Sequence, residues 1–223
     1  MKTITFFYDV ISPYAHLAFE AWPQAMAGLG HRVRHVPVLF AGVLAHHGQL
    51  GPAEIAPKRD WTYRQVAWLA HRAGVRLDMP ASHPFNPLAL LRLGTACSLH
   101  AGAQGGTSRF VTEALFHHVW HGGADPNDPA RLAALQQRLT EHMAECGHPM
   151  PAPDSPEVKQ ALRANTDAAI AAGVAARIRA FRSISAPAAC EARGPADTGH
   201  RQAPSDRRGT PAAAGLLRAC RSL

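Results

Sequence analysis

The sequence predicts an α/β fold in which an all-helical insertion interrupts the strands and helices that form the α/β frame. Residues 3–8 are β-branched and aromatic, which favours a buried strand, and residues 31–38 alternate apolar and polar side chains as a second strand does. A helix between these two runs gives a strand–helix–strand unit, in which the two strands are parallel. Residues 50–155 then read as consecutive helices separated by Gly and Pro clusters, which indicates a helical insertion.

The first helix is expected over about residues 13–29. Ser12 stands directly before Pro13. Serine is a preferred N-cap residue, and proline suits the first helical position because its missing N–H is not needed there. After the second strand, Gly and Pro spacing predicts a short helix and then a loop, over residues 40–47 and 50–57.

Five more helices follow from the apolar spacing and from the Gly and Pro positions that separate them. They are expected at residues 59–74, 86–100, 106–121, 129–145 and 156–173, with a proline-rich connection at 80–87. The predicted organisation is therefore an N-terminal βαβ part (1–49), a helical insertion (50–155), a return helix of the α/β frame (156–174) and an Arg/Ala/Pro-rich tail (175–223).

Composition bounds the class of protein. The chain has 223 residues, of which 47% are hydrophobic, enough for one domain or one domain with an inserted subdomain. Apolar runs stay well short of the ~18 residues that a membrane-spanning helix needs, and the N-terminus lacks a signal pattern. Cys97, Cys146, Cys190 and Cys220 show neither C-x-x-C nor zinc spacing, so we expect reduced cysteines and a cytoplasmic protein.

The net charge of +7 comes almost entirely from the tail. Residues 1–174 contain 14 Lys and Arg against 13 Asp and Glu, whereas residues 175–223 contain 9 Arg against 3 acids. A basic folded surface for nucleic acid is therefore not predicted. Binding of nucleic acid by the tail ranks last among the functions considered, because its arginines lack interleaved aromatic residues.

The end of the first strand carries the main candidate site. A serine hydroxyl there faces the free N–H groups and positive dipole end of a helix, an arrangement that favours an anion. The tetrapeptide that begins at Ser12 also stands where thioredoxin-like oxidoreductases have C-x-x-C. Serine cannot form a disulfide, but it can hydrogen-bond a thiolate that a cofactor brings. The alternative is that Ser12 is a helix cap only.

Four segments resemble the 2-hydroxychromene-2-carboxylate isomerases, which are relatives of kappa-class glutathione transferases and of DsbA oxidoreductases. In chain order they are FYDVISPYAHLA (7–18), GPAEIAPKRDWTYR (51–64), HPFNPLALLR (83–92) and ALRANTDAAIAAGV (161–174). The resemblance implies a thioredoxin-like fold with inserted helices that cover the active site. It also implies glutathione as cofactor, bound at Ser12, Pro13 and Tyr14, with Ser12 as the catalytic residue.

The reaction implied is the interconversion of 2-hydroxychromene-2-carboxylate and trans-o-hydroxybenzylidenepyruvate in the breakdown of naphthalene-type aromatics. The expected partner is thus a small aromatic carboxylate; a homodimer is left open. Lys58 and Arg59, cations at a helix start, are candidates for its carboxylate or a solvated surface pair. Trp61 is expected either to form an aromatic wall of the substrate site or to pack in the core. Asn86 is a polar group at the pocket or a helix cap.

The tail departs from the family. The family continues after the return helix with a cis-proline loop, a hairpin and a last helix, which complete the sheet and the glutathione site. Residues 175–223 instead contain 13 Ala and few large apolar residues, so we expect them to be disordered, with the last strands and helix missing or replaced. A reading-frame change near residue 175 is favoured over a natural basic tail that binds an acidic partner.

Other chemistry has less support. His117 and His121 lie four residues apart, with His118 between them, but the H-E-x-x-H pattern is absent and a further ligand at a matching spacing is not apparent. Exposed helix histidines are therefore expected, and a metal site is not. The alternatives to the isomerase are a kappa-like glutathione transferase, a DsbA-like thiol protein with other substrates, and a non-enzymatic protein that associates with nucleic acid.

Overall fold

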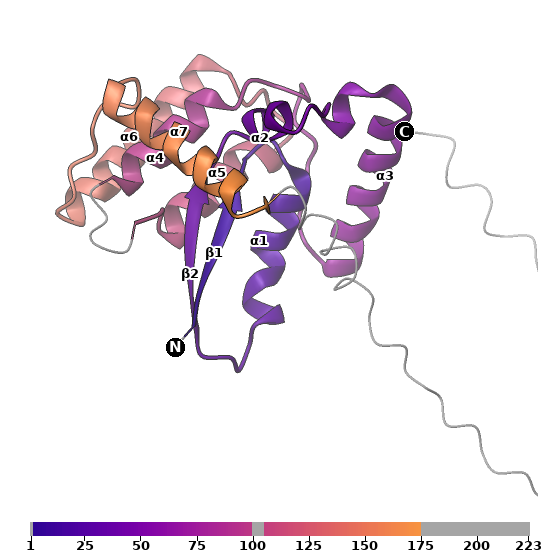
Figure 1. Ribbon diagram of the computed structural model, residues 1–223, viewed down its shortest axis with the longest axis horizontal. Coiled ribbons are helices and arrows are strands. Elements are labelled where there is room, and N and C mark those ends of the chain that lie inside the picture. The colour runs from indigo at the N-terminus through magenta and orange to yellow at the C-terminus, as the bar shows by residue number, and fades with distance from the viewer. Residues whose placement is uncertain (1, 100–104, 175–223) are drawn as a thin grey trace, which may run out of the picture. The chain divides into compact units, whose positions relative to one another are not determined.

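The structure, a computed structural model, describes residues 2–99 and 105–174 (Figure 1). It begins with β1 (Lys2–Tyr8), α1 (Pro13–Ala25), β2 (His31–Pro37) and α2 (Phe40–His46). A 3-10 turn η1 (Pro52–Glu54) precedes four helices, α3 (Ala56–Ala73), α4 (Leu88–Ser98), α5 (Arg109–Trp120) and α6 (Pro129–Glu145). Helix α7 (Pro156–Ala171) ends the described part. The expected tail, 175–223, lies outside the described residues.

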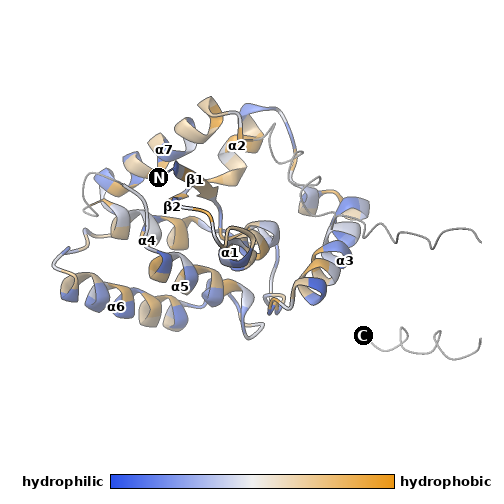
Figure 2. Cartoon of the chain, turned by 90° about the horizontal axis from the view of Figure 1, so that it is seen from below, coloured by the Kyte–Doolittle hydropathy of each residue, from blue (hydrophilic) through white to orange (hydrophobic). Residues whose placement is uncertain are grey.

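The strand–helix–strand start is confirmed. β1 and β2 pair in parallel, from Lys2 opposite His31 to Tyr8 opposite Pro37. They form a two-stranded sheet within residues 2–99 and 105–174. Parallel strands place their carboxyl ends at the same edge, so α1 and α2 both begin there. Figure 2 shows α2 and α7 on one side of this pair, and α1 and α5 on the other.

Several helix ends differ from the prediction. Helix α1 ends at Ala25 rather than near residue 29, because the chain turns at Gly28, which has φ 79°; Pro23 lies inside the helix. Helix α3 begins at Ala56, three residues earlier than expected, because a proline is accommodated in its first turn. Helix α5 begins later, at Arg109, since Gly106 has φ 105° and Ser108 is the N-cap.

Helix α5 lies at the centre of the main hydrophobic core. Leu115, Phe116, Val119 and Trp120 are completely buried and pack with residues of β1, α1, α4 and α6. The Trp120 indole Nε1 donates to the carbonyl of Val10 at 2.9 Å. The inserted helix α5 therefore fixes the loop that follows β1 through a buried hydrogen bond.

Helix α7, the predicted return helix, packs on β2. Val36, Val38 and Ala169 form a separate buried cluster. Thr166 Oγ1 accepts a hydrogen bond from the backbone N–H of Leu39 at 3.0 Å, just after β2. In the described part of the chain, the helices fall short of the length and apolar character needed to cross a bilayer.

Candidate functional site

The loop of residues 9–12 connects β1 to α1 and is fixed by a buried carboxylate. Asp9 is 4% exposed; its Oδ1 accepts from the N–H of Ile11 at 3.0 Å and its Oδ2 from the N–H of Phe40 at 2.8 Å. It therefore ties this loop to the start of α2. Burial raises the pKa of the Asp9 carboxyl to about 7, although the two N–H donors act in the opposite direction.

Ser12 is the N-cap of α1, as the sequence predicts. Its backbone is extended (φ −88°, ψ 112°), and its Oγ accepts from the N–H of Ala15 at 3.3 Å. Pro13, buried, takes the first helical position. The Ser12 side chain is half-buried, and in the described part of the chain its hydroxyl hydrogen has no hydrogen-bond acceptor. This O–H remains able to donate to a ligand at the helix end.

Three polar contacts connect α3, directly or through His83, to the residues on either side of Ser12. Tyr14 Oη donates to Gln65 Oε1 at 2.5 Å, which joins α1 to α3. His83 Nε2 lies 2.8 Å from the carbonyl of Ile11, and its Nδ1 lies 2.7 Å from the Tyr63 hydroxyl. Tyr63, Gln65 and His83 thus position the residues on either side of Ser12.

The protonation of His83 follows from its partners. A carbonyl only accepts, so Nε2 carries the proton and Nδ1 accepts from the Tyr63 hydroxyl. Burial lowers the pKa of His83, which keeps the ring neutral and consistent with this tautomer. The sequence analysis did not predict a role for His83, although this residue begins one of the four segments. Its position beside a proline at the start of that segment could have indicated such a role.

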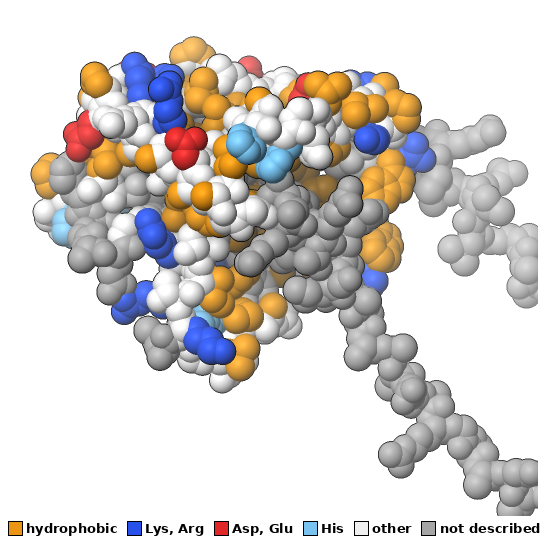
Figure 3. Space-filling view, viewed as in Figure 1, with side chains coloured by type: hydrophobic (Ala, Val, Ile, Leu, Met, Phe, Trp, Pro, Cys, Tyr) orange, Lys and Arg blue, Asp and Glu red, His pale blue; other side chains and the backbone are white. Residues whose placement is uncertain are grey.

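The predicted substrate residues on α3 are at the surface. Lys58 and Arg59 are exposed in the first turns of this helix, and Trp61 is 50% exposed. In Figure 3, hydrophobic side chains are exposed over α3. Lys58, together with Leu50 and Ile55, lines an open cavity of about 400 Å³. Within the described residues, hydrogen bonds or ion pairs do not link Lys58 or Arg59 to Ser12, so their substrate role stays a prediction.

Asn86 is exposed, just before α4. Its Oδ1 accepts from the N–H of Leu88 at 3.1 Å, two residues further on. The N-cap of α4 is Pro87, so Asn86 closes a local turn one residue before it, and the prediction that Asn86 is the N-cap is wrong by one residue. A role in binding substrate stays a prediction.

The two histidines of α5 and its C-cap, His121, differ from the expectation of exposed residues. His117, His118 and His121 are each half-buried because α5 is central to the core. His118 Nε2 hydrogen-bonds the carbonyl of Pro126 at 2.9 Å, and burial lowers the pKa of His118. The prediction also overlooked Glu113, four residues before His117, and Glu20 of α1, whose Oε1 is 3.0 Å from His117 Nε2.

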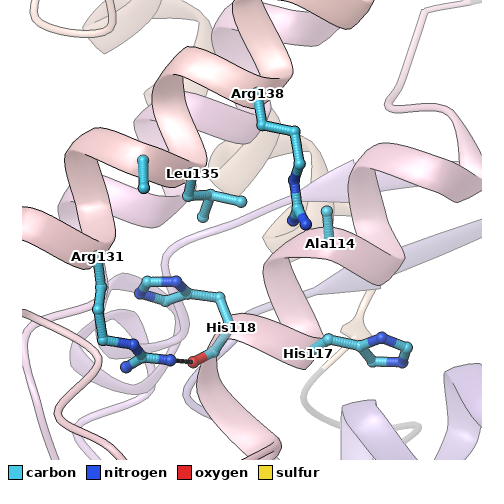
Figure 4. A pocket seen from close by; sticks show the side chains of 7 residues that line it. Ala114, His117, His118, Arg131, Leu135 and Arg138 are labelled. Carbon is cyan, nitrogen blue, oxygen red and sulfur yellow. Dashed lines mark hydrogen bonds between the residues drawn. The ribbon is translucent and has the colours of Figure 1, made fainter.

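A second open cavity, of about 410 Å³, lies between α5 and α6 and apart from the Ser12 end of α1 (Figure 4). Its lining includes His118, Leu135 and Arg138. Arg131 closes one side, where its guanidinium donates to the carbonyl of His118 at 2.7 Å. Figure 4 shows the His118 ring turned toward Arg131 and the His117 ring turned away from it. His117 therefore belongs mainly to the side of α5 that faces α1.

A βαβ unit whose crossover helix begins at a capped Ser-Pro turn is the arrangement found in proteins of the thioredoxin-like class. The family model described as "DSBA-like thioredoxin domain" matches residues 3–175. The chain belongs to this DsbA-like family. The predicted thioredoxin-like fold is thereby confirmed, and the expected relationship to isomerases and kappa-class transferases is confirmed by the relatives that the chain matches.

Known relatives include two kinds of enzyme. Glutathione S-transferase kappa 2 of Caenorhabditis elegans is 27% identical over 178 residues, 77% of this chain and 77% of that protein. A 2-hydroxychromene-2-carboxylate isomerase of Sphingobium xenophagum is 29% identical over 133 residues, 59% of this chain and 65% of that protein. A solved structure of 2-hydroxychromene-2-carboxylate isomerase shares the fold, with a TM-score of 0.59 and 21% identity over 75% of this chain and 79% of the other.

Proposed function

We propose that this chain is a glutathione-dependent isomerase of the 2-hydroxychromene-2-carboxylate isomerase type. The enzymatic class rests on relatives that are isomerases and glutathione transferases. The particular reaction is supported by the four sequence segments and by the geometry around Ser12. When bound, glutathione supplies a sulfur nucleophile for reversible addition to the conjugated double bond of the substrate, which permits rotation about that bond.

The observation that carries the proposal is the hydroxyl of Ser12 at the start of α1. Its oxygen already accepts from the N–H of Ala15, so its hydrogen is directed away from that contact and is able to donate to a sulfur anion. The N-terminus of α1 adds the positive end of the helix dipole, which stabilises the ionised form of a thiol. Asp9 and His83 hold the loop, so the hydroxyl is positioned before ligand arrives.

The substrate carboxylate is assigned to the start of α3. Lys58 and Arg59 lie near a helix N-terminus whose first turn contains no acidic residue. Two cations are disfavoured there by the helix dipole; Asp60 Oδ1 lies 3.9 Å from Arg59 Nε, and a bound carboxylate would add to this compensation and reach Lys58. Trp61, half-exposed on the same helix, is the proposed aromatic contact, and Asn86 the proposed polar contact.

The test compares two N-cap serines. Ser12 and Ser155 each accept from the N–H three residues ahead, both at 3.3 Å, so Ser12→Ala and Ser155→Ala each remove one cap. Loss of a hydrogen bond to a charged group costs about 1.5–3 kcal/mol, which corresponds to a turnover roughly ten- to a hundred-fold lower for Ser12→Ala. Ser155→Ala should lose about 1 kcal/mol of stability and keep its turnover.

The assay follows isomerisation by absorbance and glutathione binding by calorimetry, with circular dichroism to verify folding. Absorbance of bound thiolate against pH measures the pKa of the thiol directly, and this pKa should rise in Ser12→Ala. Equal turnover and an equal thiol pKa in Ser12→Ala and the unmodified chain would exclude the proposed role. A chain in which a family-type C-terminus replaces residues 175–223, tested in parallel, shows what these residues contribute.

A kappa-like transferase activity is the second candidate. The specific observation in its favour is the longer match to the kappa 2 enzyme, over 178 residues against 133 for the isomerase. Conjugation of glutathione to a chlorodinitrobenzene-type substrate separates the two activities. Disulfide exchange at this site is not supported, because Ser12 and Ala15 occupy the positions of the two redox cysteines.

A further inference from the structure

A cluster of metal-ligand side chains lies between α1 and α5, on a surface that the proposed isomerase activity does not use. Glu113 and His117 are four residues apart on α5, and Glu20 faces them from α1. One oxygen of each glutamate and one nitrogen of His117 all lie within 4.8 Å of one another. We propose that Glu20, Glu113 and His117 bind one divalent transition-metal ion, such as zinc.

The charges of the cluster favour a cation. His117 Nε2 is 3.0 Å from Glu20 Oε1 and 4.0 Å from Glu113 Oε1. The second distance exceeds a hydrogen bond, so one imidazole faces two carboxylates and satisfies one of them. The three side chains are 36%, 22% and 40% exposed for His117, Glu20 and Glu113, which leaves a path for an ion from solvent.

The donor set determines the kind of ion. Imidazole and carboxylate together suit zinc, cobalt or nickel better than calcium or magnesium, which prefer oxygen alone. Bond lengths of about 2.0–2.2 Å place tetrahedral ligands roughly 3.4 Å apart, so modest side-chain movements bring all three donors to one ion. Water fills the fourth position. The proton on Nε2 moves to Nδ1 or to solvent when the metal takes its place.

A second, independent observation supports a ligand here. His16 of α1 is 0% exposed, and its Nε2 donates to the carbonyl of Arg76 at 2.9 Å. Its Nδ1 is therefore a bare acceptor, and it is buried without a hydrogen-bond partner in the described part of the chain. The His16 ring stands edge-on to those of His117 and His121, at centroid distances of 6.4 and 5.6 Å. Burial of a bare acceptor is costly, so a polar partner beside the His16 ring, such as water held by the ion, would stabilise the fold.

The ion would bridge α1 to the helical insertion. Glu20 is on the helix that Ser12 begins, so the site fixes α1 against α5 at a distance from the glutathione end. Because the metal binds the folded chain, thermal stability should rise with the metal concentration. This inference does not depend on the proposed isomerase activity.

The test uses the full chain after treatment with a chelator. Calorimetry with zinc should give one site per chain, and Glu113→Gln and His117→Gln should each weaken its affinity at least ten-fold while circular dichroism stays unchanged. Glu145→Gln, at an exposed position on α6, is the matched control and should keep the affinity. In the absorption spectrum, cobalt(II) bound at the proposed oxygen and nitrogen ligands should show d–d bands. A charge-transfer band from sulfur to cobalt should be absent, because none of these ligands contains sulfur.

The main rival is the pair His142 and Cys146, whose Nε2 and Sγ lie 3.8 Å apart on α6. Cys146→Ser should therefore leave zinc binding unchanged. Three results overturn the proposal: an absence of one-to-one binding, equal affinity in Glu113→Gln and the unmodified chain, or a cobalt spectrum with sulfur charge transfer that Cys146→Ser abolishes.

Discussion

The raised pKa of Asp9 makes the stability of this protein depend on pH in a predictable direction. Burial raises the pKa of the Asp9 carboxyl from 3.8 to about 7 in the folded chain. Between these pH values the folded chain therefore retains a proton that the unfolded chain has released. Stability from this group is therefore complete below pH 3.8 and is lost as pH rises toward 7. At 1.36 kcal/mol for each pH unit, wild type should lose about 2–3 kcal/mol between pH 5 and pH 8 through Asp9.

Asp9→Asn isolates this contribution. The amide cannot accept at both the Ile11 and Phe40 N–H groups, so the variant is less stable at pH 5. It has no carboxyl to ionise, however, and the stability difference from wild type should shrink by about 2–3 kcal/mol between pH 5 and pH 8. Buried histidines with lowered pKa values act in the opposite direction, but they are present in both proteins and cancel.

Urea unfolding at half-unit pH intervals measures the difference directly. Asp167→Asn, at an exposed aspartate on α7, is the control and should follow the wild-type curve throughout. The reasoning is refuted if the curves of Asp9→Asn and wild type run parallel from pH 5 to pH 8.

Three substitutions test the packing that holds the site. Gly94→Ala places a Cβ 2.8 Å from a buried side-chain carbon of α5. The free-energy cost of this overpacking should exceed the free energy gained from the better helix propensity of Ala, so the free energy of unfolding should fall by about 1–2 kcal/mol. Tyr63→Phe leaves Nδ1 of His83 without its donor and should cost about 1 kcal/mol, whereas an unchanged urea midpoint argues against this contact. Trp120→Phe removes the donor to Val10 and leaves a void, for a loss of about 2–4 kcal/mol by the same assay.

The early part of the fold could be predicted because its signals are local. A β-branched strand, a Ser-Pro helix start and an alternating second strand occur within the first 38 residues, and each acts through neighbours in the chain. The short helix after β2 and the limits of α6 were predicted for the same reason. Errors occurred at helix ends, where proline in a first turn or glycine at positive φ shifts the boundary by a few residues.

The sequence by itself determined that a serine hydroxyl caps the helix after the first strand, since cap and helix are adjacent in the chain. Only the tertiary structure decided which groups surround that turn. His83 reaches Ile11 across 72 residues, and His117 reaches Glu20 across 97. Such pairs are brought together by packing of α3 and α5 against α1, and the free energy that selects them comes from burial of apolar faces rather than from any local pattern.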